Sequence, residues 1–115
     1  NTVGPGMIID IETAKPVLGF KKGGISGPAI KPVAVRCIYD IYKKTNLPII
    51  GMRGVLSGRD AIEFLMAGAS FIGVGSAVYY RGISVFNKIL SEMDDWLKDK
   101  RYKNFSDLIG LSHEL

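Results

Sequence analysis

Two short apolar runs that stop at glycine, with a helix-length segment between them, constrain the fold of this 115-residue chain most strongly. Residues 47–51 and 70–74 have the length and composition of buried strands, and the apolar residues of 57–67 recur with helical spacing. A strand, a helix and a second strand in this order form a parallel pair joined by a right-handed crossover. The pattern therefore predicts an α/β fold with glycine turns at the carboxyl ends of two neighbouring strands.

The two glycine turns also predict a binding site for an anion. Glycine has no Cβ, so a turn can tighten until several backbone N–H groups point at one anion. In many (β/α)8 barrels the loops after strands seven and eight hold a phosphate in this way. A purely structural explanation stays open at this point, in which the glycines only end the strands and allow helices to pack closely.

The rest of the chain predicts a hairpin followed by a regular αβαβα order. Residues 7–12 and 17–20 read as two short strands joined by a turn, so residues 7–20 form a hairpin outside the main sheet. Residues 1–6 contain two glycines and a proline and are expected to form a loop. Helices are expected over 28–44, 57–67 and 85–97, with a short final segment at 105–111.

Size and composition exclude several classes of protein. The chain is well short of the roughly 250 residues of a complete (β/α)8 barrel, and it opens with Asn1, so a piece of a longer protein is expected. No apolar run approaches the roughly 18 residues of a membrane span. The net charge of +4 comes from scattered lysines and arginines, which favours a solvated surface over a nucleic-acid patch.

Side chains for nucleophilic, acid–base or metal chemistry do not cluster in the sequence. The single cysteine, Cys37, cannot form an internal disulfide, which fits a reducing, cytoplasmic setting. It lies on the apolar stripe of its helix, so a core role is favoured over a reactive thiol. The only histidine, His113, falls in a polar tail, and Asp10 and Glu12 read as surface residues. We therefore expect no catalytic residue and no metal site in these residues.

Several motifs along nearly the whole chain resemble the dihydroorotate dehydrogenases, most closely the NAD-linked type of the soluble class 1 enzymes. The motifs are NT at 1–2, KPVLG at 15–19, GGISGPAIKP at 23–32, PIIGMRG at 48–54, SGRDA at 57–61 and GVGS at 73–76. The long run at 23–32 is the most specific of them.

This resemblance implies a fold and an activity. The family is a (β/α)8 barrel that carries FMN and oxidises dihydroorotate to orotate in pyrimidine biosynthesis. The chain would be its C-terminal third, with the hairpin at the barrel mouth and helices six to eight around strands seven and eight. The implied partners are the N-terminal remainder of the barrel, a second copy in a homodimer, and an electron-transfer subunit. The family's catalytic base, a cysteine in class 1, would lie upstream of this chain.

The resemblance also assigns site residues. Asn1 and Thr2 match the pair that binds the orotate ring and carboxylate. The positions that match FMN-binding residues are Gly27, Gly51, Arg53, Gly54, Gly75 and Ser76, of which those after the two strands match the phosphate-binding turns.

Arg53 departs from the family, which usually has glycine at that position. If the backbone there needs a positive φ angle, arginine is strained; if it does not, the guanidinium can add a charge-assisted contact to phosphate. We expect phosphate binding to be retained. Three other readings remain open: a dihydropyrimidine dehydrogenase-like flavin barrel, a phosphate-binding barrel without redox function, and a purely structural piece.

Overall fold

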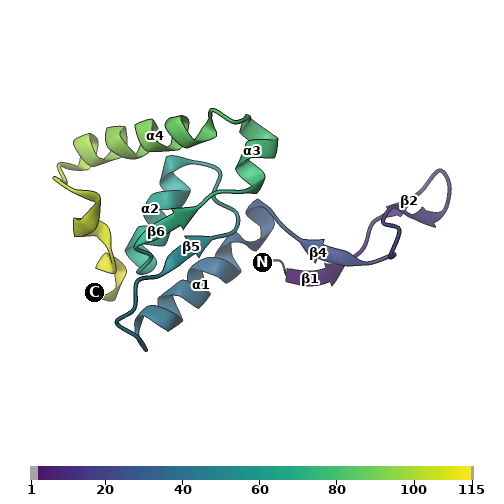
Figure 1. Cartoon of the computed structure of the whole chain (residues 1–115), viewed down its shortest axis with the longest axis horizontal. Coiled ribbons are helices and arrows are strands. Elements are labelled where there is room, and N and C mark those ends of the chain that lie inside the picture. Colours follow the sequence, from purple (N-terminus) through teal and green to yellow (C-terminus); the bar gives the residue numbers. More distant parts are fainter. Residues whose placement is uncertain (1–2, 115) are drawn as a thin grey trace.

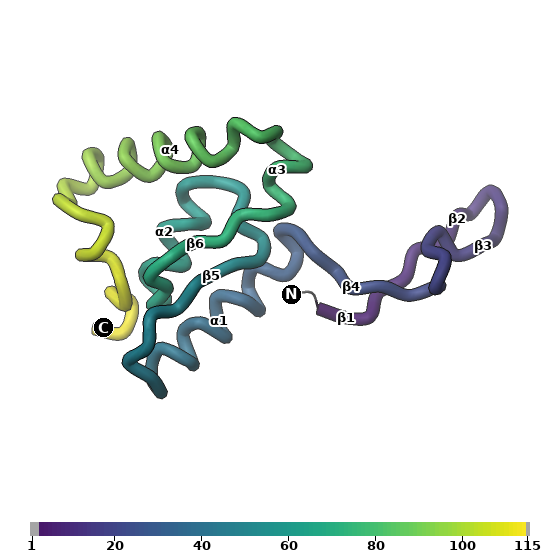
Figure 2. The backbone as a smooth tube through the Cα atoms, in the orientation of Figure 1, coloured from purple at the N-terminus to yellow at the C-terminus, as the bar shows by residue number. Residues whose placement is uncertain are grey.

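The computed structural model describes residues 3–114 and divides them into two regions of different build (Figure 1). Residues 3–26, which we call the arm, are a slender ribbon of short antiparallel strands. Residues 27–114, which we call the body, hold all the α-helices and a two-stranded parallel sheet. The structure measures 54 × 33 × 20 Å. It is this long because the arm extends away from the body, as the tube in Figure 2 shows.

The arm consists of two small ladders. Strand β1 (Val3–Gly6) pairs with β4 (Gly23–Ile25), and β2 (Ile9–Asp10) pairs with β3 (Lys15–Pro16). The structure thus has a hairpin within 7–20, but the strand expected over 17–20 is wrong. The N–H of Lys21 donates to the carbonyl of Leu18 at 2.8 Å and turns the chain there. The loop expected over 1–6 is also wrong for its described part, which is strand β1.

The parallel pair and the helix between its strands agree with the sequence prediction. Strands β5 (Ile50–Met52) and β6 (Phe71–Gly73) are parallel, and α2 (Gly58–Ala67) connects them. The Ser57 side chain accepts from the N–H of Asp60, whose carboxylate accepts from the N–H of Ser57, so the predicted capping box is present. Gly68 ends the helix in a left-handed conformation.

The other helices differ from the prediction mainly at their ends. The helix expected over 28–44 begins as a 3₁₀ turn (Pro28–Ile30) and continues as α1 (Lys31–Tyr42). A short helix, α3 (Ser76–Arg81), precedes α4 (Val85–Lys100), so the order is αβαβαα. Two 3₁₀ turns follow, Phe105–Leu108 and Leu111–His113. None of the helices in the described part of the chain has the length and hydropathy to cross a membrane.

The core lies between the helices and one face of the sheet. Phe64, Val85 and Leu108 are the largest fully buried side chains. A Cβ on Gly51 would lie 2.6 Å from a ring carbon of Phe64, so Gly51 faces the helices and leaves room for that ring. On the opposite face, Ile50 and Phe71 are 60% and 63% exposed. In a barrel that second face points into the barrel interior.

Of two sequence expectations about packing, one holds only in part and one is wrong. The apolar stripe of α1 is only partly a core face, because Ala34 and Ile38 are buried while Val33 is exposed and Cys37 is half-buried. His113 does not lie in a polar tail, since its ring stacks on Tyr39 with the ring centroids 3.9 Å apart.

The C-terminal segment is held against the body by several such contacts. Nε2 of His113 lies 3.0 Å from the carbonyl oxygen of Ala67, and the Ser112 hydroxyl donates to the carbonyl of Met66. Trp96 of α4 also stacks on Tyr102, in the segment after that helix, with the ring centroids 5.7 Å apart. These contacts make the last described residues part of the body.

Candidate functional site

Three turns of the chain meet around one hollow of about 310 Å³. One turn follows β4, one follows β5 and one follows β6. The hollow is lined by Ser26, Gly27, Ile30, Met52, Arg53, Gly54, Val55, Gly73, Val74, Gly75 and Ser76. It therefore lies at the carboxyl ends of the two parallel strands, where parallel α/β folds place their ligands.

The backbone around the hollow is tightly turned and closely approached. Gly27, Arg53 and Gly54 all have positive φ angles, of 98°, 94° and 77°. A Cβ on Gly54 would lie 2.8 Å from the carbonyl oxygen of Gly27, so the turns after β4 and β5 touch through their backbones. Only glycine fits such an approach at position 54. The hydroxyl of Tyr80, on α3, lies 3.7 Å from where a Cβ of Gly27 would be.

The charge around the hollow favours an anion. Arg53 is the only charged residue among those that line it, and no carboxylate lies among them. A larger groove of about 700 Å³ lies over α2 and is lined by both acidic and basic side chains of the helices. We take the smaller hollow as the candidate site because three backbone turns converge on it and its single charge is positive.

The similarity of this chain to known proteins is extensive. A model of the dihydroorotate dehydrogenase family matches residues 1–97. The catalytic subunit of dihydroorotate dehydrogenase B (NAD(+)) from Methanothermobacter thermautotrophicus is 47% identical over 114 residues, and the subunit of the same name from Methanosarcina acetivorans is 50% identical over 115 residues. The chain belongs to the dihydroorotate dehydrogenase family.

The chain spans only part of these relatives. It is aligned over 99% and 100% of its own length but covers 38% and 36% of the two archaeal subunits. A crystal structure of the Eimeria tenella DHODH in complex with ferulenol superimposes with a TM-score of 0.81 at 32% identity, over all of this chain and 30% of that one. The prediction of an α/β portion of a (β/α)8 dihydroorotate dehydrogenase barrel is confirmed.

Five of the six FMN-site positions assigned from the family resemblance come together. Gly27, Arg53, Gly54, Gly75 and Ser76 all line the hollow. Gly51 does not, because it is buried against Phe64 on the helical face of the sheet. The two substrate positions, Asn1 and Thr2, lie outside the described residues.

The backbone at Arg53 has the positive φ angle at which an arginine is strained. Its φ of 94° lies in the region that residues with a side chain rarely adopt. Such a conformation costs on the order of 1–3 kcal/mol and persists only where the surroundings impose it. Here Gly51 is buried before it and Gly54 touches the neighbouring turn after it, so residue 53 has little freedom to relax.

Sequence reasoning missed the polar side chains that surround the turns. Lys31 donates to Asp60 and Glu63 at 2.7 and 2.6 Å. These bonds raise the pKa of the Lys31 ammonium above its usual value. Burial acts to raise the pKa of Asp60, but the bonds from Lys31, Leu56 and Ser57 outweigh it and hold that pKa below its usual value. The capping-box pattern pointed to Asp60, whereas no sequence signal links it to Lys31.

Candidate metal ligands do not gather anywhere in the described residues. Over 3–114, no group of three or more His, Cys, Asp or Glu side chains is placed to hold a metal ion.

Proposed function

We propose that the protein to which this chain contributes is an FMN-dependent dihydroorotate dehydrogenase, which oxidises dihydroorotate to orotate in pyrimidine biosynthesis. One observation carries the proposal: one hollow is lined by the family's phosphate-binding positions after β5 and β6, and Arg53 is the only charged residue among the described residues that line it. Family membership supports the same activity. The part of this chain is to bind and orient the cofactor.

The residues of the hollow suit the phosphate of FMN. The turns through Gly27 and Gly54 have positive φ angles, which suit backbone N–H groups that converge on an anion. The Ser76 hydroxyl can donate one more hydrogen bond, and Arg53 can donate a charge-assisted one. When bound, FMN supplies the redox chemistry by accepting a hydride from dihydroorotate.

The remaining parts of the active site are proposed from the family resemblance. Asn1 and Thr2 bind the substrate ring and carboxylate, and the catalytic base is a cysteine upstream of this chain. Cys37 is not that base, because it is half-buried on α1 and does not line the hollow.

The family resemblance also implies the partners of this chain. This chain is the C-terminal third of the barrel, and the N-terminal remainder covers the exposed sheet face that carries Ile50 and Phe71. The protein is a cytoplasmic homodimer with a separate electron-transfer subunit. The two archaeal relatives are catalytic subunits of an NAD(+) enzyme, which supports the separate subunit.

Purification of the intact protein tests this proposal. We expect flavin absorbance, release of FMN on denaturation, and bleaching of the bound flavin when dihydroorotate is added without an acceptor. A protein that carries no flavin and does not oxidise dihydroorotate after incubation with FMN would contradict the proposal. Bound phosphate without flavin would instead favour a barrel without redox function.

A pair of glycine variants tests the role of the hollow. Gly54→Ala places a Cβ at 2.8 Å from the Gly27 carbonyl oxygen at a positive φ, so FMN affinity should fall at least about tenfold. Gly19→Ala is the matched control, because a Cβ there meets nothing within 4 Å. Equal FMN affinities in the two variants would remove this hollow from the cofactor site.

A further inference from the structure

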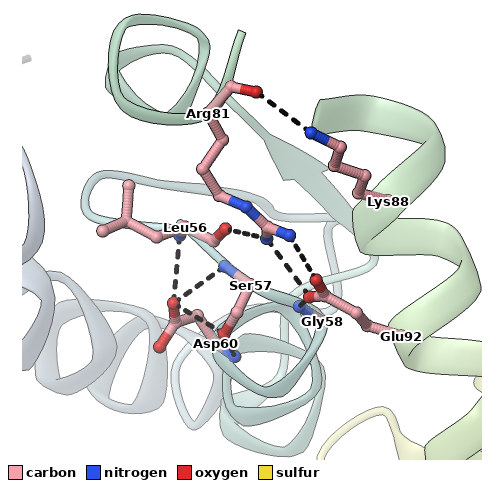
Figure 3. A network of polar contacts seen from close by, with 7 residues as sticks. All are labelled: Leu56, Ser57, Gly58, Asp60, Arg81, Lys88 and Glu92. Atoms are coloured by element: carbon pink, nitrogen blue, oxygen red, sulfur yellow. Dashed lines mark hydrogen bonds and ion pairs between the residues drawn. The ribbon is translucent and has the colours of Figure 1, made fainter. Parts of the chain in front are cut away.

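The backbone of Leu56, in the turn after β5, is held from both sides by side chains of other elements (Figure 3). Its N–H donates to Oδ2 of Asp60 at 3.0 Å, and its carbonyl accepts from Nη1 of Arg81 at 2.7 Å. One carboxylate and one guanidinium therefore fix the two peptide groups on either side of the Leu56 Cα. We call the set Lys31, Asp60, Arg81 and Glu92, with the Leu56 backbone, the Leu56 clamp.

The Asp60 half of the clamp connects the turn after β5 to the turn after β4. Oδ2 of Asp60 also accepts from the N–H and hydroxyl of Ser57, both at 3.0 Å. Its other oxygen accepts from Nζ of Lys31 at 2.7 Å. Lys31 is the first residue of α1, four residues after Gly27, and a Cβ on Gly54 would lie 2.8 Å from the Lys31 Cβ. The stem of Lys31 thus packs directly beside the hollow.

The Arg81 half connects the turn after β5 to the turn after β6. Arg81 is the last residue of α3, which begins at Ser76 in the hollow. Its guanidinium pairs with the carboxylate of Glu92 on α4, and Oε2 of Glu92 accepts from the N–H of Gly58 at 2.6 Å. Figure 3 shows Arg81 and Glu92 reaching across the gap between α3, α4 and the first turn of α2.

The clamp joins elements that border the hollow, but its own side chains do not line it. None of its four side chains lines the hollow, so none of them is placed to touch a ligand there. They are also only partly shielded, since the side chains of Asp60 and Arg81 are 19% and 29% exposed. Ion pairs at such exposure contribute little to global stability. Their connections run instead between the three turns, and the spacing of those turns decides how many N–H groups can reach one anion.

We propose that Asp60 and Arg81 are positioning residues, which act through the backbone of Leu56 to hold the three turns at the spacing that a bound phosphate group needs. The inference rests on the proposed function, because it assigns these residues to the phosphate end of the same cofactor. It concerns affinity for the phosphate group and not for the flavin ring. A loosened clamp leaves the ring contacts in place and weakens only the phosphate contacts.

The test compares FMN with riboflavin, which lacks the phosphate, in the intact protein after removal of its flavin. Binding of each is followed by quenching of flavin fluorescence in the wild type, Arg81→Met and Asp60→Asn. We expect FMN affinity to fall about tenfold or more in each variant, the size of loss that follows removal of outer-shell residues behind metal ligands. Riboflavin affinity should stay close to that of the wild type, because the ring contacts are unchanged. Arg81→Lys, which keeps the charge but has only one donor nitrogen, should retain part of the affinity that Arg81→Met loses.

Two further proteins guard against misfolding and unspecific charge effects. Glu92→Gln keeps an acceptor for the N–H of Gly58 but loses the ion pair with Arg81, so it should show the same selective loss in a milder form. Arg36→Met is the matched control, because it breaks an exposed Arg36–Asp40 pair on α1 that is far more solvated. Thermal unfolding of every variant is measured alongside.

The outcomes separate this inference from the proposed function. If the wild type does not distinguish FMN from riboflavin, the hollow is not a phosphate site and both proposals fail. If the wild type prefers FMN and the folded clamp variants keep that preference, only the positioning role fails. A parallel loss of affinity for both ligands would likewise overturn it, since that is the result of a general structural defect.

Discussion

The arm and the body both contain many apolar side chains, but only the body buries them. Among the described residues 3–26 none is buried, and Phe20 is 97% exposed. The body instead encloses a continuous core around Phe64, Val85 and Leu108. Helices that pack on one sheet face can stabilise each other, whereas an isolated two-stranded ribbon is marginal in water. The arm therefore gains little stability from the burial of its own side chains.

Truncation of one aromatic ring in each region gives the largest expected contrast. Phe64→Ala removes a fully buried ring and should lower the free energy of unfolding by about 3–5 kcal/mol. Phe20→Ala should change it by less than about 0.5 kcal/mol in the 115-residue chain, because that ring has no neighbours to lose. Urea unfolding followed by circular dichroism measures both.

The same variants, measured in the intact protein, test whether other parts of the protein cover the arm. In the intact protein Phe20→Ala should cost more than in the 115-residue chain, since the remainder of the barrel or a second copy is expected to cover the arm. Equal small effects in both settings would mean that the arm stays exposed in the intact protein as well, which would contradict its being covered there.

A fall in pH should also affect the two regions differently, with a smaller effect than truncation of the aromatic rings. The Arg81 hydrogen bond holds the pKa of Glu92 below its usual 4.5, and the pKa of Asp60 also lies below its usual 3.8. A lowered carboxylate pKa in the folded state stabilises the fold above the usual value, and this stabilisation is lost as the pH falls through the folded value. We therefore expect the urea concentration at the midpoint of unfolding to decrease once the pH falls below about 4.5.

The arm carboxylate Asp10 should not contribute to that loss. Its pKa is lowered chiefly by the Thr13 side chain and the Glu12 N–H, which lie in the same turn. Protonation opens a local turn and leaves the body untouched. The check is the acid titration of Asp60→Asn and of Asp10→Asn: the first should flatten the decline, and the second should leave it as in the wild type.

Relief of backbone strain gives the smallest effect. Arg53→Gly removes a side chain at a φ of 94°, and the body should gain less than about 1 kcal/mol because glycine also has more freedom when unfolded. The same variant should lose about tenfold in FMN affinity if the guanidinium contacts the phosphate. Lys21→Gly relieves a φ of 66° in the arm and should leave the unfolding of the body unchanged. An Arg53→Gly protein that binds FMN more tightly would exclude Arg53 as a ligand.

Sequence reasoning succeeded where the deciding chemistry is local. The Ser57–Asp60 capping box and the end of α2 at Gly68 follow from residues within a turn of each other, and both are present. The parallel strands followed from two apolar runs and the helix between them. The family motifs then assigned five residues that prove to share one hollow.

It failed where a residue's environment is set by distant or absent neighbours. Helical periodicity identifies the stripe of Val33, Cys37 and Ile41 but not whether this chain supplies the surface that covers it. Arg81 and Glu92 are 11 residues apart on different helices, so no local pattern links them. The sequence did not tell whether the φ angle of Arg53 is positive, because the surrounding backbone decides it.

The stack of Trp96 on Tyr102 has a practical consequence for these measurements. Trp96 is the only tryptophan of this chain, and it joins α4 to the segment that follows it. Its fluorescence is therefore an intrinsic optical probe of the body, because separation of the two rings changes the surroundings of the indole. The arm has no tryptophan and would be invisible to the same signal. In the 115-residue chain, tryptophan emission thus reports on the body alone.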